Sequence, residues 1–387
     1  MMASPAARSI VLATLTSAAA SVHAADWRVT PAISSSVAYV GNPRLSRDGG
    51  DAYTSHQAEL SAPMSFDNGR SQLSLTPRFV YAAYPDDPLL DRNDTYVTLA
   101  AQRRYETATL SASADFISDS TLTSELGLTG LQETNRPHET WILTAAPTLL
   151  LSDRTQVGAQ LNWSDNSYKD AEFTGLADYR YSLGAISASY AWSQNVQLSL
   201  QSSFGRLEVP VSGARSDNIN ATASASWQYS ELWRAQLSVG PSLVEAGGVS
   251  SRGYVYSVGT TRQGQRSTVS ALVTKDVTPT GQGVLVARER ARLSVAHAFT
   301  DRLGATVSAD FVRNEDAVVV RGIGPRAASY QYGIVNTSLN WRFTPNWSAV
   351  LAASGRTLSN SSTDADASGY SMGLSLQWRG DPQAWAR

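Results

Sequence analysis

The sequence predicts an all-β fold, a transmembrane antiparallel up-and-down β-barrel of about 18 strands, with about 16 as the alternative. Three observations predict it. A hairpin pattern recurs along the chain, apolar and polar residues alternate between the turns, and short connections alternate with long polar ones. Together they indicate a sheet with two chemically different faces and two different ends.

The hairpin pattern consists of an aromatic or bulky apolar residue, a few turn-forming polar residues and an alternating run. It is seen in "HAFTDRLGATVSADF" at 297–311. It returns in "FDNGRSQLSLTPRF" (66–79), "YETATLSASADF" (105–116), "WSQNVQLSLQSSF" (192–204), "YSELWRAQLSVGP" (229–241) and "FTPNWSAVLAASG" (343–355). Each copy predicts two strands joined by a tight turn.

The alternation places apolar side chains on one face of each predicted strand. In "WRVTPAISSSVAYV" this face holds Trp27, Val29, Ile33, Val37 and Tyr39. Such segments suit a barrel wall with lipid outside and a polar lumen inside. Strands are expected to begin near residues 27, 53, 71, 94, 108, 139, 155, 177, 195, 217, 232, 253, 266, 284, 303, 328, 346 and 367.

Turn length fixes which residues face each other across a hairpin. In "FDNGRS" a two-residue turn of type I′ is expected to pair Asp67 with Arg70, which switches the outward face from even to odd numbers. In "FTDRL" three loop residues keep the parity. They therefore place Arg292 opposite Asp310 on the lumen side.

The long connections include "GNPRLSRDGGD", "YPDDPLLDRND", "DSTLTSELGLTGLQETNRPHE", "VTKDVTPTGQG" and "SNSSTDADAS". Short periplasmic turns and long surface loops are typical of outer-membrane barrels. Aromatic side chains beside the short turns are then expected to form a girdle at the periplasmic membrane boundary. The girdle comprises Phe66, Tyr105, Trp192, Tyr229, Trp233, Phe299, Phe343 and Trp347.

The first residues, "MMASPAARSIVLATLTSAAASVHAAD", combine Arg8, an apolar core and a small-x-small site ending at Ala24. This pattern predicts a secretory signal peptide over residues 1–24. Without a linker or a composition shift, residues 25–378 are expected to form one barrel domain, and 379–387 a short C-terminal tail. The expected location is the outer membrane, with its lipid and lipopolysaccharide as partners.

The segment "SMGLSLQW" resembles the signal by which the barrel-assembly machinery recognises a last strand. Ser371, Gly373, Leu376 and Trp378 carry the resemblance. It implies that this machinery is a partner. The sequence departs from the usual pattern because "RGDPQAWAR" follows the motif.

With these segments in view, the chain resembles uncharacterised outer-membrane barrels of the porin type that are associated with exopolysaccharide or protein-sorting loci. The hairpin repeat, "WRVTPAISSSVAYVGN", "LADYRYSLGAISASYAWSQNVQLSLQSSF" and "SMGLSLQW" carry the resemblance over residues 27–378. It implies polysaccharide-export components as partners. No catalytic or ligand residue carries over.

Composition argues against several other functions. A formal net charge of -2 gives no basis for nucleic-acid binding, and with no cysteine there is no thiolate site. Outside the signal peptide the histidines are His56, His138 and His297, and none stands beside an evident Ser and Asp pair. We therefore expect no enzyme activity, no cofactor and no metal site.

The lumen-facing charges are the candidate functional residues. Arg288, Arg290 and Arg292 alternate along one predicted strand and favour anions if they are unpaired. Alternatively they pair with carboxylates and stiffen the wall. Inward Arg78, Asp115 and Asp310 either form a constriction or are ordinary lumen charges.

Three functions therefore compete. A barrel of this strand number leaves an aqueous lumen, which favours a porin-like channel for passive passage of small solutes. The resemblance implies a conduit or accessory for exopolysaccharide export. A structural or adhesive surface barrel that does not conduct is the third alternative.

Overall fold

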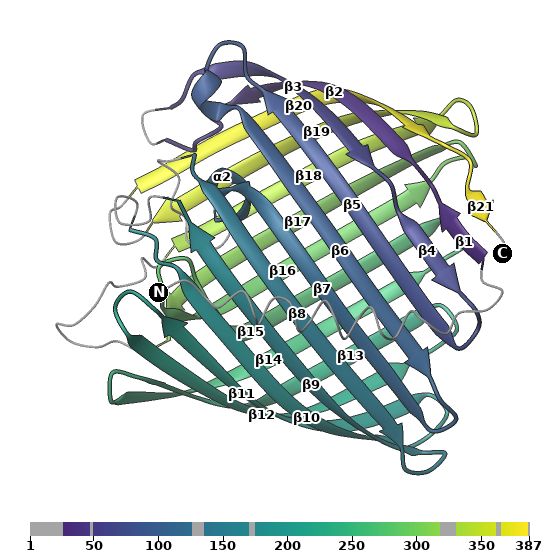
Figure 1. Cartoon of the computed structure of the whole chain (residues 1–387), viewed down its shortest axis with the longest axis vertical. Helices are drawn as coiled ribbons and strands as arrows, with labels where there is room; N and C mark the ends of the chain where they lie inside the picture. Colours follow the sequence, from purple (N-terminus) through teal and green to yellow (C-terminus); the bar gives the residue numbers. More distant parts are fainter. Residues whose placement is uncertain are drawn as a thin grey trace.

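The computed structural model describes residues 26–46, 49–125, 135–169, 175–317, 330–360 and 365–385. The signal peptide and the loop around Leu126 lie outside these residues. The described chain forms one closed antiparallel sheet, seen in Figure 1 as tilted strands around a single barrel.

Its strands are β1 (Asp26–Val29), β2 (Ala32–Gly41), β3 (Ala52–Ser61), β4 (Met64–Asp67), β5 (Ser71–Ala83), β6 (Arg92–Arg104), β7 (Ala108–Ser120), β8 (Pro137–Leu150), β9 (Thr155–Tyr168), β10 (Tyr179–Ala191), β11 (Val196–Val209), β12 (Ala214–Gln228), β13 (Trp233–Ala246), β14 (Val249–Gln263), β15 (Ser267–Pro279), β16 (Leu285–Ala298), β17 (Leu303–Asp316), β18 (Tyr330–Arg342), β19 (Trp347–Asn360), β20 (Ala365–Arg379) and β21 (Gln383–Trp385).

Two short helices lie in the long connections. The 3-10 helix η1 (Pro88–Leu90) lies between β5 and β6, and α2 (Thr121–Ser124) follows β7. Ser120 caps α2, because its side-chain oxygen accepts a hydrogen bond from the Leu122 N–H. Within the described part of the chain, no helix is both long and apolar enough to span a membrane.

The 21 strands form 18 wall strands, because three of the wall strands are each interrupted once and so divide into two. The breaks separate β1 from β2, β3 from β4 and β20 from β21, and Pro31, Pro63 and Pro382 lie in them. Proline has no N–H to give to a strand ladder, so the ladder is interrupted where it stands. The wall closes where β2 pairs with β20 and β1 pairs with β21. The predicted count of about 18 is confirmed, and 16 is wrong.

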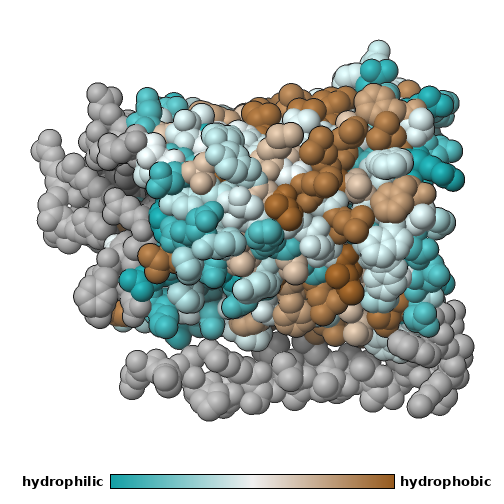
Figure 2. All heavy atoms as spheres, turned by 90° about the horizontal axis from the view of Figure 1, so that it is seen from above, coloured by the Kyte–Doolittle hydropathy of each residue, from teal (hydrophilic) through white to brown (hydrophobic). Residues whose placement is uncertain are grey.

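The outward face of the wall is apolar over a broad belt. Large apolar side chains on alternate residues are exposed there, for example Ile33 at 52%, Leu200 at 65% and Leu374 at 59%. Figure 2 shows part of this belt, with hydrophilic residues on either side of it. An exposed apolar surface of this extent marks a contact with something other than water.

The first tight turn differs from its prediction. Asp67 pairs with Gln72 rather than with Arg70, a register shift of two residues that leaves the predicted faces unchanged. Side chains cause the shift, because the Asp67 carboxylate accepts from the Gly69 N–H (2.7 Å) and the Asn68 side chain accepts from the Ser71 N–H (2.6 Å). The pKa of the Asp67 carboxyl lies below its usual value, mainly because the carboxylate accepts a hydrogen bond from the Gly69 N–H and, to a smaller extent, one from the Gln72 side chain.

The turn in "FTDRL" matches its prediction. The Phe299 N–H donates to the Leu303 carbonyl at 2.9 Å and closes the hairpin. Leu293 faces Ala309, and Arg292 faces Asp310, as the loop length requires. The predicted register is confirmed.

This register predicts opposite outcomes for two neighbouring substitutions. Arg292→Asp sets a like charge against Asp310 and should cost roughly 0.2 to 1 kcal/mol of unfolding free energy. Leu293→Arg, on the face predicted to meet lipid, should cost about 2 to 4 kcal/mol near the midplane. Urea titration of barrels refolded into vesicles measures both. A harmless Leu293→Arg would show that the inner and outer faces are exchanged.

Candidate functional site

The candidate site is the interior of the barrel, where inward residues are mostly small and polar. They hydrogen-bond to one another across neighbouring strands. The Asn162 amide donates to Thr144 Oγ1 at 3.0 Å, and Ser224 Oγ lies 2.9 Å from Ser238 Oγ. Uncharged pairs of this kind make the wall hydrophilic around them without adding charge of either sign.

The three predicted arginines lie together on β16, but they are not equivalent. Arg290 and Arg292 both bind the Asp310 carboxylate, with Nε to oxygen distances of 2.8 Å and 3.2 Å. Arg288 Nε donates to Asn314 Oδ1 at 3.3 Å. The sequence left open whether these arginines pair with carboxylates. In the structure, two of the three arginines do.

Arg78 and Asp115 lie on another part of the wall, on β5 and β7. Arg78 pairs with Glu59 at 3.3 Å and stacks over the Tyr96 ring at 4.6 Å. Asp115 accepts a hydrogen bond from Thr98 Oγ1 at 2.7 Å. Strand order places these residues on a different part of the wall from Asp310, so the six predicted charges form two groups. A constriction between the two groups stays a prediction. The sequence reasoning missed Glu59 as a partner.

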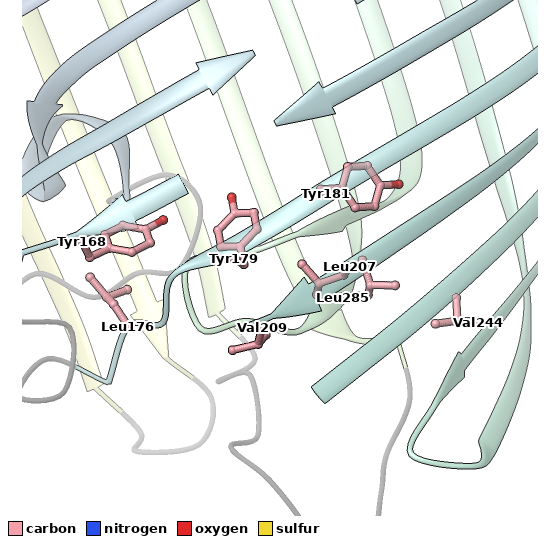
Figure 3. Close-up of a cluster of buried hydrophobic side chains, with 8 residues drawn as sticks. All are labelled: Tyr168, Leu176, Tyr179, Tyr181, Leu207, Val209, Val244 and Leu285. Carbon is pink, nitrogen blue, oxygen red and sulfur yellow. The ribbon is translucent and has the colours of Figure 1, made fainter. Parts of the chain in front are cut away.

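The barrel core sits inside its long-connection end. Figure 3 shows eight buried side chains there, from β9, β10, β11, β13, β16 and the chain before β10. They are Tyr168, Leu176, Tyr179, Tyr181, Leu207, Val209, Val244 and Leu285. A second cluster packs Leu45 against Tyr330, Tyr332 and Leu358. Tyrosines and inward-folded connections therefore narrow this mouth of the lumen.

Connections from different hairpins hold one another in place at the mouth. Tyr168 on β9 donates its hydroxyl to Glu125 Oε1 at 2.5 Å. The Ala177 N–H donates to the Gly281 carbonyl at 2.7 Å, although the two residues follow strands well apart in the wall. A Cβ on Gly281 would lie 2.8 Å from the Tyr168 hydroxyl, so this close approach requires glycine.

A buried histidine anchors α2 to this mouth. His138 Nδ1 lies 3.0 Å from Asp119 Oδ1 and 3.1 Å from Ser124 Oγ, and its Nε2 lies 2.9 Å from Thr140 Oγ1. The ring also stacks on Tyr168. A catalytic relay needs a hydroxyl and a carboxylate on opposite ring nitrogens. Thr140 and Asp119 occupy these positions, but the Thr140 hydroxyl is buried and donates to Asn166 Oδ1 at 2.8 Å. The sequence pattern gave no signal that Ser124 and Asp119 converge on His138.

The other two histidines lie away from the lumen mouth. His56 is exposed on β3. His297 bonds Ser267 through Nδ1 at 2.7 Å and packs on Phe299. No group of three or more acidic or histidine side chains that could hold a metal ion occurs among the residues that the structure describes.

The predicted girdle residues lie beside the short turns. Seven are exposed, whereas Phe66 is 4% exposed because Trp27 of β1 packs against it at 5.3 Å. The exposed members are Tyr105, Trp192, Tyr229, Trp233, Phe299, Phe343 and Trp347.

The residues of the predicted assembly signal lie on β20, at the closing seam with β2. Leu376 is exposed at 45%. A Cβ on Gly373 would lie 2.8 Å from the Ala38 Cβ, so the motif glycine permits close packing across the seam. Recognition by the assembly machinery stays a prediction.

Comparison with known proteins gives likenesses in fold. No protein-family model matches the chain, and no curated protein matches its sequence. OpdQ of Pseudomonas aeruginosa is 10% identical, with a TM-score of 0.47 over 93% of this chain and 98% of that one. The outer membrane protein OpdK of the same species (12%, 0.44, 92% and 99%) and OccAB4 of Acinetobacter baumannii (12%, 0.44, 92% and 98%) are also similar. At such identities and TM-scores these likenesses do not bear on function.

Removing the His138 ring should loosen α2 without unfolding the barrel. Loss of one buried hydrogen-bonding group costs about 1 to 3 kcal/mol, so the Leu122 and Glu125 amides of His138→Ala should exchange hydrogen about tenfold faster or more. Hydrogen exchange read by mass spectrometry measures this, with exposed His56→Ala as the control. Equal exchange in both variants would contradict the anchoring role.

Proposed function

We propose that this chain is an outer-membrane channel that passes small solutes. The observation that carries the proposal is a closed wall of 18 strands, apolar outside and polar inside. A closed barrel leaves no unpaired sheet edge in the hydrocarbon, and barrels of this size enclose a wide lumen. The apolar belt supports insertion in a bilayer, and the signal-like N-terminus supports export to the outer membrane.

The structure of the mouth favours small solutes over a polymer. Leu45 and Leu176, from the connections after β2 and β9, pack inside the wall at this end. Arg44 also pairs with Asp87 at 2.9 Å, which ties the connections after β2 and β5 together. An exported polysaccharide chain would have to displace these contacts.

The polysaccharide and adhesion alternatives each have a distinct readout. Deletion of the gene should leave surface polysaccharide unchanged if the barrel is a general channel, and should abolish it if the barrel is an exporter. A structural or adhesive barrel should conduct no ions in planar bilayers.

Selectivity should depend on Asp310. This carboxylate neutralises part of the charge of Arg290 and Arg292, so the wild-type channel should discriminate weakly between anions and cations. Asp310→Asn frees both guanidinium groups and should raise the anion-to-cation permeability ratio several-fold, measured as a reversal potential in a salt gradient. Inward Ser308→Ala on the same strand is the control. An unchanged ratio would show that these arginines do not face the conduction path.

The orientation can be tested because the chain contains no cysteine. Asp86→Cys, in the long connection after β5, and Asp366→Cys, at the long-connection end of β20, should react with a membrane-impermeant maleimide on intact cells. Asp301→Cys, in a short turn, should react only after the outer membrane is opened. The reverse pattern would invert the proposed topology.

A further inference from the structure

The outward face of the barrel carries a groove that the channel function does not use. It runs across β6 to β11 and has a volume of about 560 Å³. Its outward lining residues are mostly apolar: Leu99, Ala101, Ala112, Ala114, Leu143, Ala145, Leu161, Trp163, Ser182, Gly184, Phe204 and Arg206. We call this feature the outer groove.

The strand register explains the shape of the outer groove. Its lining consists of two neighbouring rows of residues paired across six strands. The first row runs Arg206, Ser182, Trp163, Leu143, Ala114 and Leu99, and the second runs Phe204, Gly184, Leu161, Ala145, Ala112 and Ala101. Between the rows lie Ser113, Thr144, Asn162 and Leu183, whose side chains alternate to the other face. The sheet backbone is therefore the floor.

The dimensions of the outer groove select a narrow, linear occupant. Five steps between neighbouring strands give a length of about 24 Å, and outward residues two apart on a strand are about 7 Å apart. Gly184 and the alanines keep most of the second row low, while Leu161 of the second row and Trp163 of the first project on either side of the groove at β9. An α-helix with its side chains is about 10 Å across, so it is too wide to lie in the groove.

One end of the outer groove is charged. Arg206 closes it, binding Asp217 through Nε at 2.8 Å and Nη2 at 3.0 Å while its side chain stays 43% exposed. A guanidinium has five N–H donors, so the bidentate pair leaves donors for a phosphate oxygen. Beyond the first row, the partly exposed Arg180 side chain pairs with Asp165 at 3.5 Å.

We infer that the outer groove binds one acyl chain of an anionic phospholipid, with the negatively charged head group held at its phosphate by Arg206. The inference rests on the proposed membrane location but not on conduction. An apolar channel that ends at an exposed arginine matches a lipid with a long hydrocarbon chain and an anionic head. Neither a free phosphate nor a peptide helix uses both parts of the site.

The test fills the groove without altering the lumen. A Cβ on Gly184 would first meet Leu161 Cδ2 at 3.8 Å, so Gly184→Leu has room to fold. Wild type and variant are reconstituted in phosphatidylcholine vesicles containing phosphatidylglycerol, extracted in mild detergent and weighed by native mass spectrometry. Gly184→Leu should reduce retained phosphatidylglycerol at least fivefold. Ala349→Leu, on the outward face of β19 and outside the groove, should not.

A second variant separates head-group binding from chain binding. Arg206→Gln should keep the groove but lower the ratio of retained phosphatidylglycerol to phosphatidylcholine several-fold, and Arg206→Lys should restore part of it. Wild-type retention in both Gly184→Leu and Arg206→Gln overturns the inference, as does a dimer that Gly184→Leu abolishes. Flotation of wild-type barrels with vesicles tests the membrane location separately.

Discussion

Closure of the β2–β20 seam is the constraint on which the rest of the structure depends. In the proposed bilayer location, an open sheet would expose two rows of N–H and C=O groups that hydrocarbon cannot satisfy. The seam pairs ten residues of β2 with β20, and Gly373 permits the close packing against Ala38. Once the wall is closed, alternation alone decides which side chains meet the lumen. Both the apolar belt and the polar interior follow from that one pairing.

The barrel interior has two regions, a wall and a mouth, which are stabilised by different interactions. Along the wall, short polar side chains bond to their neighbours and charges are paired locally, as Arg290 and Arg292 are with Asp310. At the mouth, tyrosines and inward-folded connections form small apolar cores stabilised by burial. In the proposed channel, the polar wall would keep the path hydrated and the mouth would limit the size of solute that enters.

Local patterns sufficed to predict the strand count, the faces and the register of the "FTDRL" hairpin, because each depends on nearby residues and on turn length. The Asp67 turn was mispredicted by two residues, since Asp67 and Asn68 bond the loop backbone. The mouth could not be predicted. The contact of Tyr168 with Glu125 depends on connections from different hairpins meeting inside the barrel.

The three wall breaks have a mechanical consequence. The strands interrupted at Pro31, Pro63 and Pro382 are neighbours on either side of the closing seam, so the weakest ladders of the barrel are side by side. The seam also pairs segments from opposite ends of the chain. Bringing them together therefore costs more conformational entropy than forming any other strand pair of the barrel. We therefore expect this seam to be the last line of contacts to form when the barrel closes and the first to separate when the barrel is strained.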